Sequence, residues 1–387
     1  MPPGQVPPGL PPSGDPRSVS WSPQDHALMA TALRLAERGL GRVAPNPSVG
    51  CVLARDGRVV GRGWTQPGGR PHGETEALLR AGAAAKGATA YVNLEPCAHW
   101  GKTPPCTEAL IKAGIARAVV SCEDPDPRVS GRGLQQLRDA GISVEVGLMA
   151  EEACSLNEGF FLRISRQRPL VTLKLATTLD GRIATQRGES KWITGEAARA
   201  RAHLLRADHD AVLVGAGTAG VDDPQLDVRL PGLTSCNPLR VLLDGRLRTP
   251  LTHKMIAGAD RQPTWLFTRD DNPKDRLTAL REAGVEVLTV GLDAAERLDV
   301  TEVLAVLAER GITRLLVEGG GQVAAGFLRA DLVDRLAWFQ AGRLIGGDGL
   351  PAVAGFGLDR LVEAPAFDFE GFERLGPDLL ECWRRAS

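Results

Sequence analysis

The segments Pro71-His72-Gly73-Glu74 and Pro96-Cys97-Ala98-His99-Trp100-Gly101-Lys102-Thr103-Pro104-Pro105-Cys106 carry the chemistry around which the first half of the chain is expected to fold. One histidine and two cysteines are ligand types that tetrahedral zinc accepts, and three protein ligands leave a fourth position for water. Glu74 follows the histidine closely and could move protons while staying off the metal. This combination predicts hydrolytic deamination, in which zinc activates water and a carboxylate transfers its proton.

The surrounding pattern places these candidate residues at the beginnings of helices. Residues 74–82 have small apolar side chains on one helical face, and residues 105–113 predict a second helix that begins beside Cys106. Residues 88–94 predict a buried strand, so Cys97 follows a strand. The partial positive charge of a helix N-terminus helps to hold cysteine as thiolate, and two such ends meeting at a metal fit the zinc interpretation.

Neither segment is decisive by itself. A His-x-Glu triplet arises by chance in many chains, and a single histidine is more often structural. Together, with a strand between them, the two segments predict a metal site. A purely structural zinc would need a fourth ligand, which His99 could supply, so a closed structural site is the alternative to an open catalytic one.

Length and composition limit the class of protein to which this chain can belong. A chain of 387 residues is long enough for two domains of roughly 100–200 residues each. The formal net charge is −1 and there is no basic stripe, which argues against nucleic acid as a partner. No run approaches the ~18 apolar residues of a membrane helix. The seven cysteines, without a secretory leader, predict a reduced cytoplasmic protein. The expected free thiols are Cys51, Cys122, Cys154, Cys236 and Cys382.

Three segments are expected along the chain. Residues 1–20 are mostly Pro, Gly and Ser and predict a disordered tail. Strands alternate with helices over residues 21–165 and again over residues 166–387, which predicts two layered α/β domains, the first with a mainly parallel sheet. A connecting helix near residues 151–167 is expected at the boundary.

Two glycine-containing turns in the second half directly follow apolar strands. They are Val214-Gly215-Ala216-Gly217-Thr218 and Val317-Glu318-Gly319-Gly320-Gly321. Such turns expose backbone N–H groups that can receive a phosphate or pyrophosphate. Neither turn is the G-x-G-x-x-G fingerprint, so a Rossmann domain is not inferred. Each could equally be a tight connection with no ligand.

The motifs of the first half resemble the deaminase half of the bifunctional riboflavin-biosynthesis deaminase/reductase family. They are residues 44–52, 72–74, 96–106, 124–127 and 131–133. The resemblance implies that His72, Cys97 and Cys106 bind zinc, that Glu74 is the catalytic proton shuttle and that Asn46 contacts a pyrimidine. It also implies a three-layer, cytidine-deaminase-like fold. The sequence departs from the family pattern at Gly73, Thr65 and Asp126, none of which is an expected ligand.

The resemblance continues through the second half. The matching segments are residues 173–176, 179–184, 190–195, 214–218, 222–229 and 317–321. It implies a dihydrofolate-reductase-like α/β domain with NADPH as its cofactor. The implied cofactor-site residues are Ala176, Trp192, Thr218, Asp222, Gly245, Gly319 and Gly320. Those implied to face the substrate are Ser190, Arg206, Leu226, Arg229 and Glu318. Lys174 is a further candidate for substrate contact, because it lies near the end of an apolar strand. The alternatives are a half-buried core role for Trp192 and solvated surface charges for Lys174, Arg206 and Arg229.

The resemblance therefore implies two consecutive reactions on a phosphorylated pyrimidine. The first is zinc-dependent hydrolytic deamination, and the second is NADPH-dependent reduction of the ribosyl group to ribityl. A homo-oligomer is expected. The competing interpretations are a nucleoside or tRNA-base deaminase with a C-terminal binding module, a non-catalytic binding protein, and an enzyme in which one half has lost its activity.

Overall fold

The computed structural model describes residues 20–355 and 357–386. The disordered tail expected at residues 1–20 lies, apart from Ser20, outside the described residues. The described chain forms two compact units that divide between Gln167 and Arg168. No helix among the described residues is long and apolar enough to cross a membrane.

The first unit is built on a five-stranded sheet with the order β2-β1-β3-β4-β5. The strands are β1 (Gly50–Arg55), β2 (Arg58–Trp64), β3 (Thr89–Val92), β4 (Arg117–Val120) and β5 (Ser143–Val146). Strand β1 is antiparallel to both β2 and β3, whereas β3, β4 and β5 are parallel. The sheet is therefore mixed and not mainly parallel, because the β1–β2 hairpin enters it through the antiparallel β1–β3 pair.

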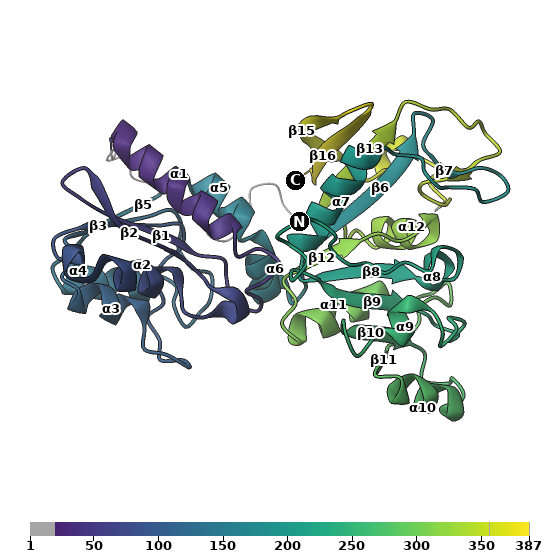
Figure 1. The fold of residues 1–387 in the computed structure, drawn as a ribbon, viewed down its shortest axis with the longest axis horizontal. Helices are drawn as coiled ribbons and strands as arrows, with labels where there is room; N and C mark the ends of the chain where they lie inside the picture. The colour runs from purple at the N-terminus through teal and green to yellow at the C-terminus, as the bar shows by residue number, and fades with distance from the viewer. Residues whose placement is uncertain (1–19, 356, 387) are drawn as a thin grey trace. The chain divides into compact units, whose positions relative to one another are not determined.

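Helices cover both faces of this sheet, which gives the unit three layers (Figure 1). The helices are α1 (Pro23–Glu37), α2 (Gly73–Ala81), α3 (Cys106–Lys112), α4 (Arg132–Asp139), α5 (Ala150–Leu156) and α6 (Glu158–Arg166), with 3-10 turns η1 (Pro67–Gly69) and η2 (Gly82–Ala85). Helices α1 and α5 lie on one face, and α2, α3 and α4 lie on the other. Ser22 and Asp25 form a reciprocal capping box that fixes the start of α1.

Glycines bring α2 unusually close to the sheet. A Cβ at Gly63 of β2 would lie 2.3 Å from the carbonyl oxygen of Gly73. A Cβ at Gly73 itself would lie 2.5 Å from the carbonyl oxygen of Val49. Real Cβ atoms are not found at such distances, so the position of the first turn of α2 depends on the absence of side chains at these two residues.

The second unit contains a nine-stranded sheet with the order β11-β10-β9-β8-β12-β6-β13-β16-β15. The strands are β6 (Leu170–Thr178), β8 (Ala211–Gly215), β9 (Leu239–Leu243), β10 (Thr264–Thr268), β11 (Glu286–Thr289), β12 (Arg314–Val317), β13 (Arg335–Ala341), β15 (Phe367–Leu375) and β16 (Asp378–Arg385). The strands from β11 to β13 are parallel, and β16 and β15 extend the sheet in antiparallel fashion. The small strands β7 (Arg182–Ala184) and β14 (Leu350–Pro351) pair separately.

Successive residues of the central parallel strands are buried on opposite faces, as expected for a sheet covered on both sides. Leu213 and Leu315 pack with α11 (Val300–Glu309) and α12 (Gly321–Arg329). Val212 and Leu316 pack on the other face. That second face is covered by α8 (Ala216–Asp222), α9 (Lys254–Ala257) and α10 (Lys274–Glu282), while α7 (Glu196–Ala207) packs on β13 and β16. The 3-10 turn η3 (Leu361–Glu363) precedes β15.

Candidate active sites

The three candidate zinc ligands come from separate elements. His72 is the N-cap residue of α2, and Cys106 is the first residue of α3. Cys97 lies in the loop that follows β3. The backbone N–H of Cys106 donates a hydrogen bond to Cys97 Sγ at 3.3 Å. This bond joins the two ends of the loop between the two cysteines.

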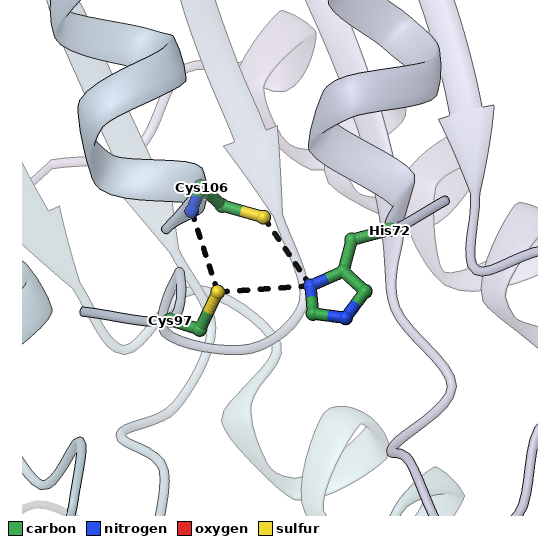
Figure 2. A group of neighbouring side chains, drawn as sticks. All are labelled: His72, Cys97 and Cys106. Carbon is green, nitrogen blue, oxygen red and sulfur yellow. Dashed lines mark hydrogen bonds between the residues drawn. The ribbon is translucent and has the colours of Figure 1, made fainter. Parts of the chain in front are cut away.

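Figure 2 shows that the ligand atoms of these residues converge. His72 Nδ1 lies 3.6 Å from Cys97 Sγ and 3.3 Å from Cys106 Sγ. The ligand atoms all lie within 4.8 Å of one another, and the group contains no fourth residue. His99, the fourth ligand of a closed structural site, is not part of the group found in the described chain. A His/Cys/Cys set with an open position fits a catalytic zinc ion.

Glu74 is placed for proton transfer beside this group. It lies in the first turn of α2 and only 2% of it is exposed. Burial raises its pKa to about 7, and the charge of His72 opposes that rise. Its Oε2 atom and His72 Nε2 are buried without hydrogen-bond partners in the described chain. A buried carboxylate with a free oxygen beside a metal-ligand set can accept and return a proton.

Asn46 and the sequence departures have clear local contacts. Asn46 Nδ2 donates to the carbonyl oxygen of Gly69 at 2.7 Å, which fixes the amide in the loop before β1. Thr65 Oγ1 accepts from the backbone N–H of Val49 at 3.0 Å, so this residue has a structural role. The carboxylate of Asp126 pairs with the guanidinium of Arg128 at 2.5 Å.

The sequence did not indicate Asp124 as a candidate. This carboxyl is 6% exposed, and burial raises its pKa to about 7, with Asp126, Glu95 and Cys97 adding to that rise. The sequence feature that could have indicated Asp124 is its position between a buried strand and a proline.

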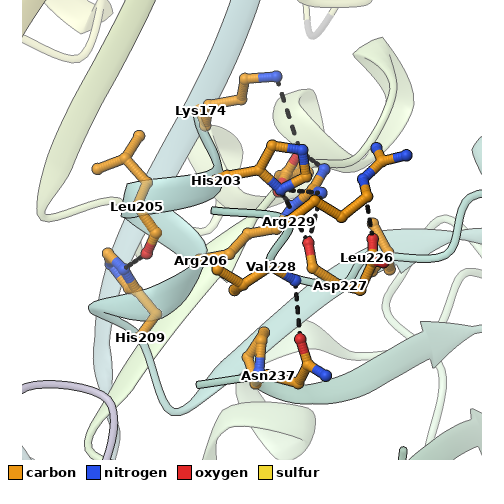
Figure 3. A network of polar contacts seen from close by, with 12 residues as sticks. Lys174, His203, Leu205, Arg206, His209, Leu226, Asp227, Val228, Arg229 and Asn237 are labelled. Carbon is orange, nitrogen blue, oxygen red and sulfur yellow. Dashed lines mark hydrogen bonds and ion pairs between the residues drawn. The ribbon is translucent and has the colours of Figure 1, made fainter. Parts of the chain in front are cut away.

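In the second unit, Lys174 and Arg206 lie in one network of polar contacts (Figure 3), and both form ion pairs with the buried carboxylate of Glu318. Arg206 of α7 donates two hydrogen bonds to it, from Nε to Oε1 at 2.5 Å and from a terminal nitrogen to Oε2 at 3.0 Å. Lys174 Nζ lies 3.6 Å from Oε2. Burial opposes ionisation of Glu318, but the positive charges of Arg206 and Lys174 prevail and lower its pKa to about 2.

The network extends to the segment that contains Leu226 and Arg229. Arg206 also donates to the carbonyl oxygen of Asp227 at 3.1 Å, and Arg229 Nε lies 3.4 Å from Asp227 Oδ1. Leu226 is buried with a φ of 55°, a left-handed conformation that is strained for leucine. The structure thus brings most of the expected substrate residues together, and Ser190 lies in the loop after β7.

The expected cofactor residues fall into two groups. Thr218 of α8 and the Gly319-Gly320 turn meet, because the backbone N–H of Gly320 donates to Thr218 Oγ1 at 3.0 Å. Gly245 lines a cleft of about 1010 Å³ together with Gly215 and Gly217. The cleft lies at the carboxyl ends of β8 and β9, where open α/β sheets bind their ligands.

Gly245 is the only expected cofactor residue in the lining of this cleft. Those outside the lining are Thr218, Gly319, Gly320, Ala176, Trp192 and Asp222. Trp192 is 62% exposed and stacks under Arg199, whose Cζ lies 4.7 Å from the ring centroid, so the core role considered for it is wrong. The arginines of the cleft were not predicted from the sequence, although Arg246 and Arg248 lie in the turn that follows the apolar strand β9.

Comparisons with known proteins cover both units. Residues 22–122 match the cytidine and deoxycytidylate deaminase zinc-binding region, and residues 169–380 match the RibD C-terminal domain. The chain is 44% identical over 355 residues to the riboflavin biosynthesis protein RibD of Bacillus amyloliquefaciens, which covers 91% of this chain and 94% of that protein. It is 41% identical over 369 residues to RibD of Escherichia coli, covering 92% and 98% of the two chains.

Solved structures agree with these matches. Acinetobacter baumannii RibD, form 1, superposes with a TM-score of 0.84 at 37% identity and covers 94% of this chain and 99% of its own. The Thermotoga maritima diaminohydroxyphosphoribosylaminopyrimidine deaminase/5-amino-6-(5-phosphoribosylamino)uracil reductase gives a TM-score of 0.82 at 36% identity with the same coverage. The expected fold, a cytidine-deaminase-like domain followed by a dihydrofolate-reductase-like domain, is confirmed.

Proposed function

This chain belongs to the RibD family of riboflavin-biosynthesis enzymes, and we propose that two separate sets of its residues perform the two reactions of that family. The chain is a bifunctional enzyme, a zinc-dependent deaminase joined to an NADPH-dependent reductase. Matches over both halves favour this function over a single-activity deaminase with a binding module. The proposed deaminase domain is residues 21–165 and the proposed reductase domain is residues 166–387, which agrees with a division of the described chain at Gln167.

For the deaminase reaction, His72, Cys97 and Cys106 are the proposed zinc ligands. Zinc held there supplies the Lewis acidity that activates water for attack on the carbon bearing the exocyclic amine. Glu74 accepts a proton from that water and returns protons to the ring nitrogen and to the departing ammonia. The convergence of the three ligand atoms within 4.8 Å beside a buried carboxylate is the observation that supports these roles. Asn46 is proposed to bind the pyrimidine through its amide.

For the reductase reaction, bound NADPH would supply the hydride for reduction of the ribosyl group to ribityl. The proposed substrate residues are Lys174, Ser190, Arg206, Leu226, Arg229 and Glu318. Glu318 uses both carboxylate oxygens to hold Arg206, so this arginine is fixed in place. Arg229 keeps its side chain 66% exposed and can therefore turn towards a substrate phosphate.

The proposed cofactor residues are Ala176, Trp192, Thr218, Asp222, Gly245, Gly319 and Gly320. Their support differs, since only Gly245 lines the cleft. Gly320 is held by Thr218 outside that lining, and Ala176, Trp192 and Asp222 also lie outside it. The glycine turns expose backbone N–H groups that suit a pyrophosphate.

We also propose that the chain forms a homo-oligomer in the cytoplasm and binds no nucleic acid. Edge strand β15 exposes 54% of Phe369 and 69% of Phe372, and apolar side chains on a sheet edge favour pairing with a second chain. The net charge of −1 supplies no general attraction for nucleic acid. Sedimentation of the wild type and of a Phe372→Glu variant tests the association.

A coupled assay with a Glu74→Gln variant tests the division of labour. Loss of a general acid–base group should slow ammonia release by about 10²–10⁴-fold. Consumption of NADPH with supplied deaminated substrate should be unchanged. Glu76→Gln is the matched control, since Glu76 lies in the same helix but pairs with Arg80 at 2.6 Å. Loss of both activities in Glu74→Gln, or loss of ammonia release in the control, would contradict the proposed roles.

A further inference from the structure

Ser48, two residues after Asn46, is held at every polar atom by groups from other segments. Its backbone N–H donates to Asn157 Oδ1 at 2.8 Å. Its carbonyl oxygen accepts from Asn157 Nδ2 at 3.1 Å and from Asn93 Nδ2 at 3.2 Å, and its hydroxyl donates to the carbonyl oxygen of Ala36. Only 3% of Ser48 is exposed, so water does not compete for these bonds. The chain directly after Asn46 is therefore fixed in position.

Asn157 lies where the helices α5 and α6 meet. It follows α5 and precedes α6, and 3% of it is exposed. Its amide uses one acceptor and one donor on the two backbone groups of a single residue, Ser48, as a neighbouring strand would. An alanine in place of Asn157 would leave the buried N–H of Ser48 without its acceptor, and an unsatisfied buried donor is costly. The position of Ser48 therefore depends on this amide.

Asn93 connects the same segment to the zinc-binding loop. It follows β3, is 0% exposed and precedes Cys97 by four residues. In addition to its bond to Ser48, it accepts at Oδ1 from the backbone N–H of Gly50, the first residue of β1, at 2.7 Å. The segment between Asn46 and β1 is thus held against the end of the strand from which the loop to Cys97 leaves.

A displacement of Ser48 would move Asn46, because Pro47 stands between them. The proline ring fixes its own φ and restricts the residue before it, so the link has little freedom. Asn46 Nδ2 already donates to the carbonyl oxygen of Gly69 at 2.7 Å, whereas Asn46 Oδ1 accepts no hydrogen bond within the described chain. This oxygen remains for an N–H group of a pyrimidine, and its direction depends on the backbone of Asn46.

We propose that Asn157 is a positioning residue of the deaminase, which holds Asn46 in place for the pyrimidine through the backbone of Ser48. This inference rests on the proposed role of Asn46. Asn93 supports the same segment from the side of the zinc-binding loop. Because the hydrogen bonds of the Asn157 amide go to Ser48, loss of this amide should weaken substrate binding and leave the zinc ligands in place.

A double-mutant cycle tests whether Asn157 acts through Asn46. Ammonia release by the zinc-loaded full chain is measured for the wild type, Asn157→Ala, Asn46→Ala and the double variant. Asn157→Ala should raise KM by about 10- to 100-fold with little change in kcat, since a contact made alike with substrate and transition state is lost. In the Asn46→Ala background the same substitution should change KM by less than about twofold, because no amide is left to position. Zinc content, and NADPH consumption with supplied deaminated substrate, should match the wild type throughout.

Tyr91→Phe is the matched control for a loss of stability in the same unit. It removes a buried hydrogen bond from Tyr91 Oη to Asp25 Oδ1 at 2.8 Å, and should lower the melting temperature while KM stays at the wild-type value. Asn157→Asp keeps the size of the side chain and the acceptor for the N–H of Ser48, but places a carboxylate oxygen against its carbonyl oxygen. It should also raise KM, and it replaces the alanine variant in the cycle if that variant does not fold.

Three results would overturn the assignment. They are additive losses in the cycle, an unchanged KM in both Asn157 variants, and an equal rise of KM in Tyr91→Phe. If Asn46→Ala keeps the wild-type KM while Glu74→Gln slows ammonia release as expected, the positioning role is wrong and the deaminase function stands.

Discussion

Replacing Arg206 with methionine should destabilise the second unit strongly. The substitution removes both hydrogen bonds to Glu318 and leaves a carboxylate with 8% side-chain exposure, whose nearest remaining cation is Lys174 at 3.6 Å. Breaking a buried pair by removing one partner typically costs about 3–5 kcal/mol. The depressed pKa of Glu318 agrees in direction, because the positive charges of Arg206 and Lys174 outweigh the cost of burying the carboxylate.

Hydrogen–deuterium exchange can measure this loss within one unit. The slowest amides of β12 report the opening free energy of the second unit, and amides of β4 in the first unit serve as an internal control. Exchange in β12 should accelerate on the order of a hundredfold in Arg206→Met, while β4 should be unaffected.

A double variant decides whether the effect belongs to the ion pair. Arg206→Met with Glu318→Gln removes both charges and should recover at least half of the lost free energy, since a pair replaced by neutral groups is often close to neutral in stability. A single variant that costs less than ~1 kcal/mol, or a double variant no more stable than the single one, would refute the reasoning.

Three further outcomes follow from the described contacts. Chelation of zinc should abolish ammonia release and leave NADPH oxidation of supplied deaminated substrate intact, with recovery on adding zinc; a chelator that stops both activities would contradict separate sites. Gly73→Ala should destabilise the first unit by about 1–3 kcal/mol and slow deamination alone, because the new Cβ would lie 2.5 Å from Val49 O; an unchanged melting curve and rate would show that the contact relaxes freely. Burial lowers the pKa of His209 to about 3, so the folded chain excludes a proton that the unfolded chain binds below its ordinary pKa of 6.5. Stability should therefore fall as pH drops from 6.5 towards 3, by about 2 kcal/mol at pH 5, and His209→Asn should lessen that slope in exchange measurements on β6.

The zinc ligands could be predicted from sequence because each lies in a local pattern. His72 and Cys106 start helices whose periodicity is visible, and Cys97 follows a buried strand. The ionic network around Glu318 could not be derived in this way. Lys174, Arg206 and Glu318 belong to distant segments, and no periodicity pairs one with another, so only family resemblance indicated them.

The sheet edges were harder to predict for a different reason. Strand β15 is mostly exposed, so it lacks the apolar run that marks the buried parallel strands. Its position depends on pairing with β16. Strand β16 in turn pairs on its other side with β13, and that pairing is between segments distant in the sequence. In the first unit, the order of strands rests on the β1–β3 pair, whose antiparallel direction no turn motif encodes.

The glycines that let α2 pack closely against the sheet affect how natural variation in this enzyme should be interpreted. Gly63 and Gly73 have no side chain that could carry a charge or donate a proton, so a substitution to alanine would pass as conservative by most chemical criteria. Yet each added methyl group would press on the backbone next to the helix start that presents His72 and Glu74. Harmful variants of the deaminase should therefore include some that alter only the volume of a residue outside the reaction, and the tolerated alleles at these two positions should be few.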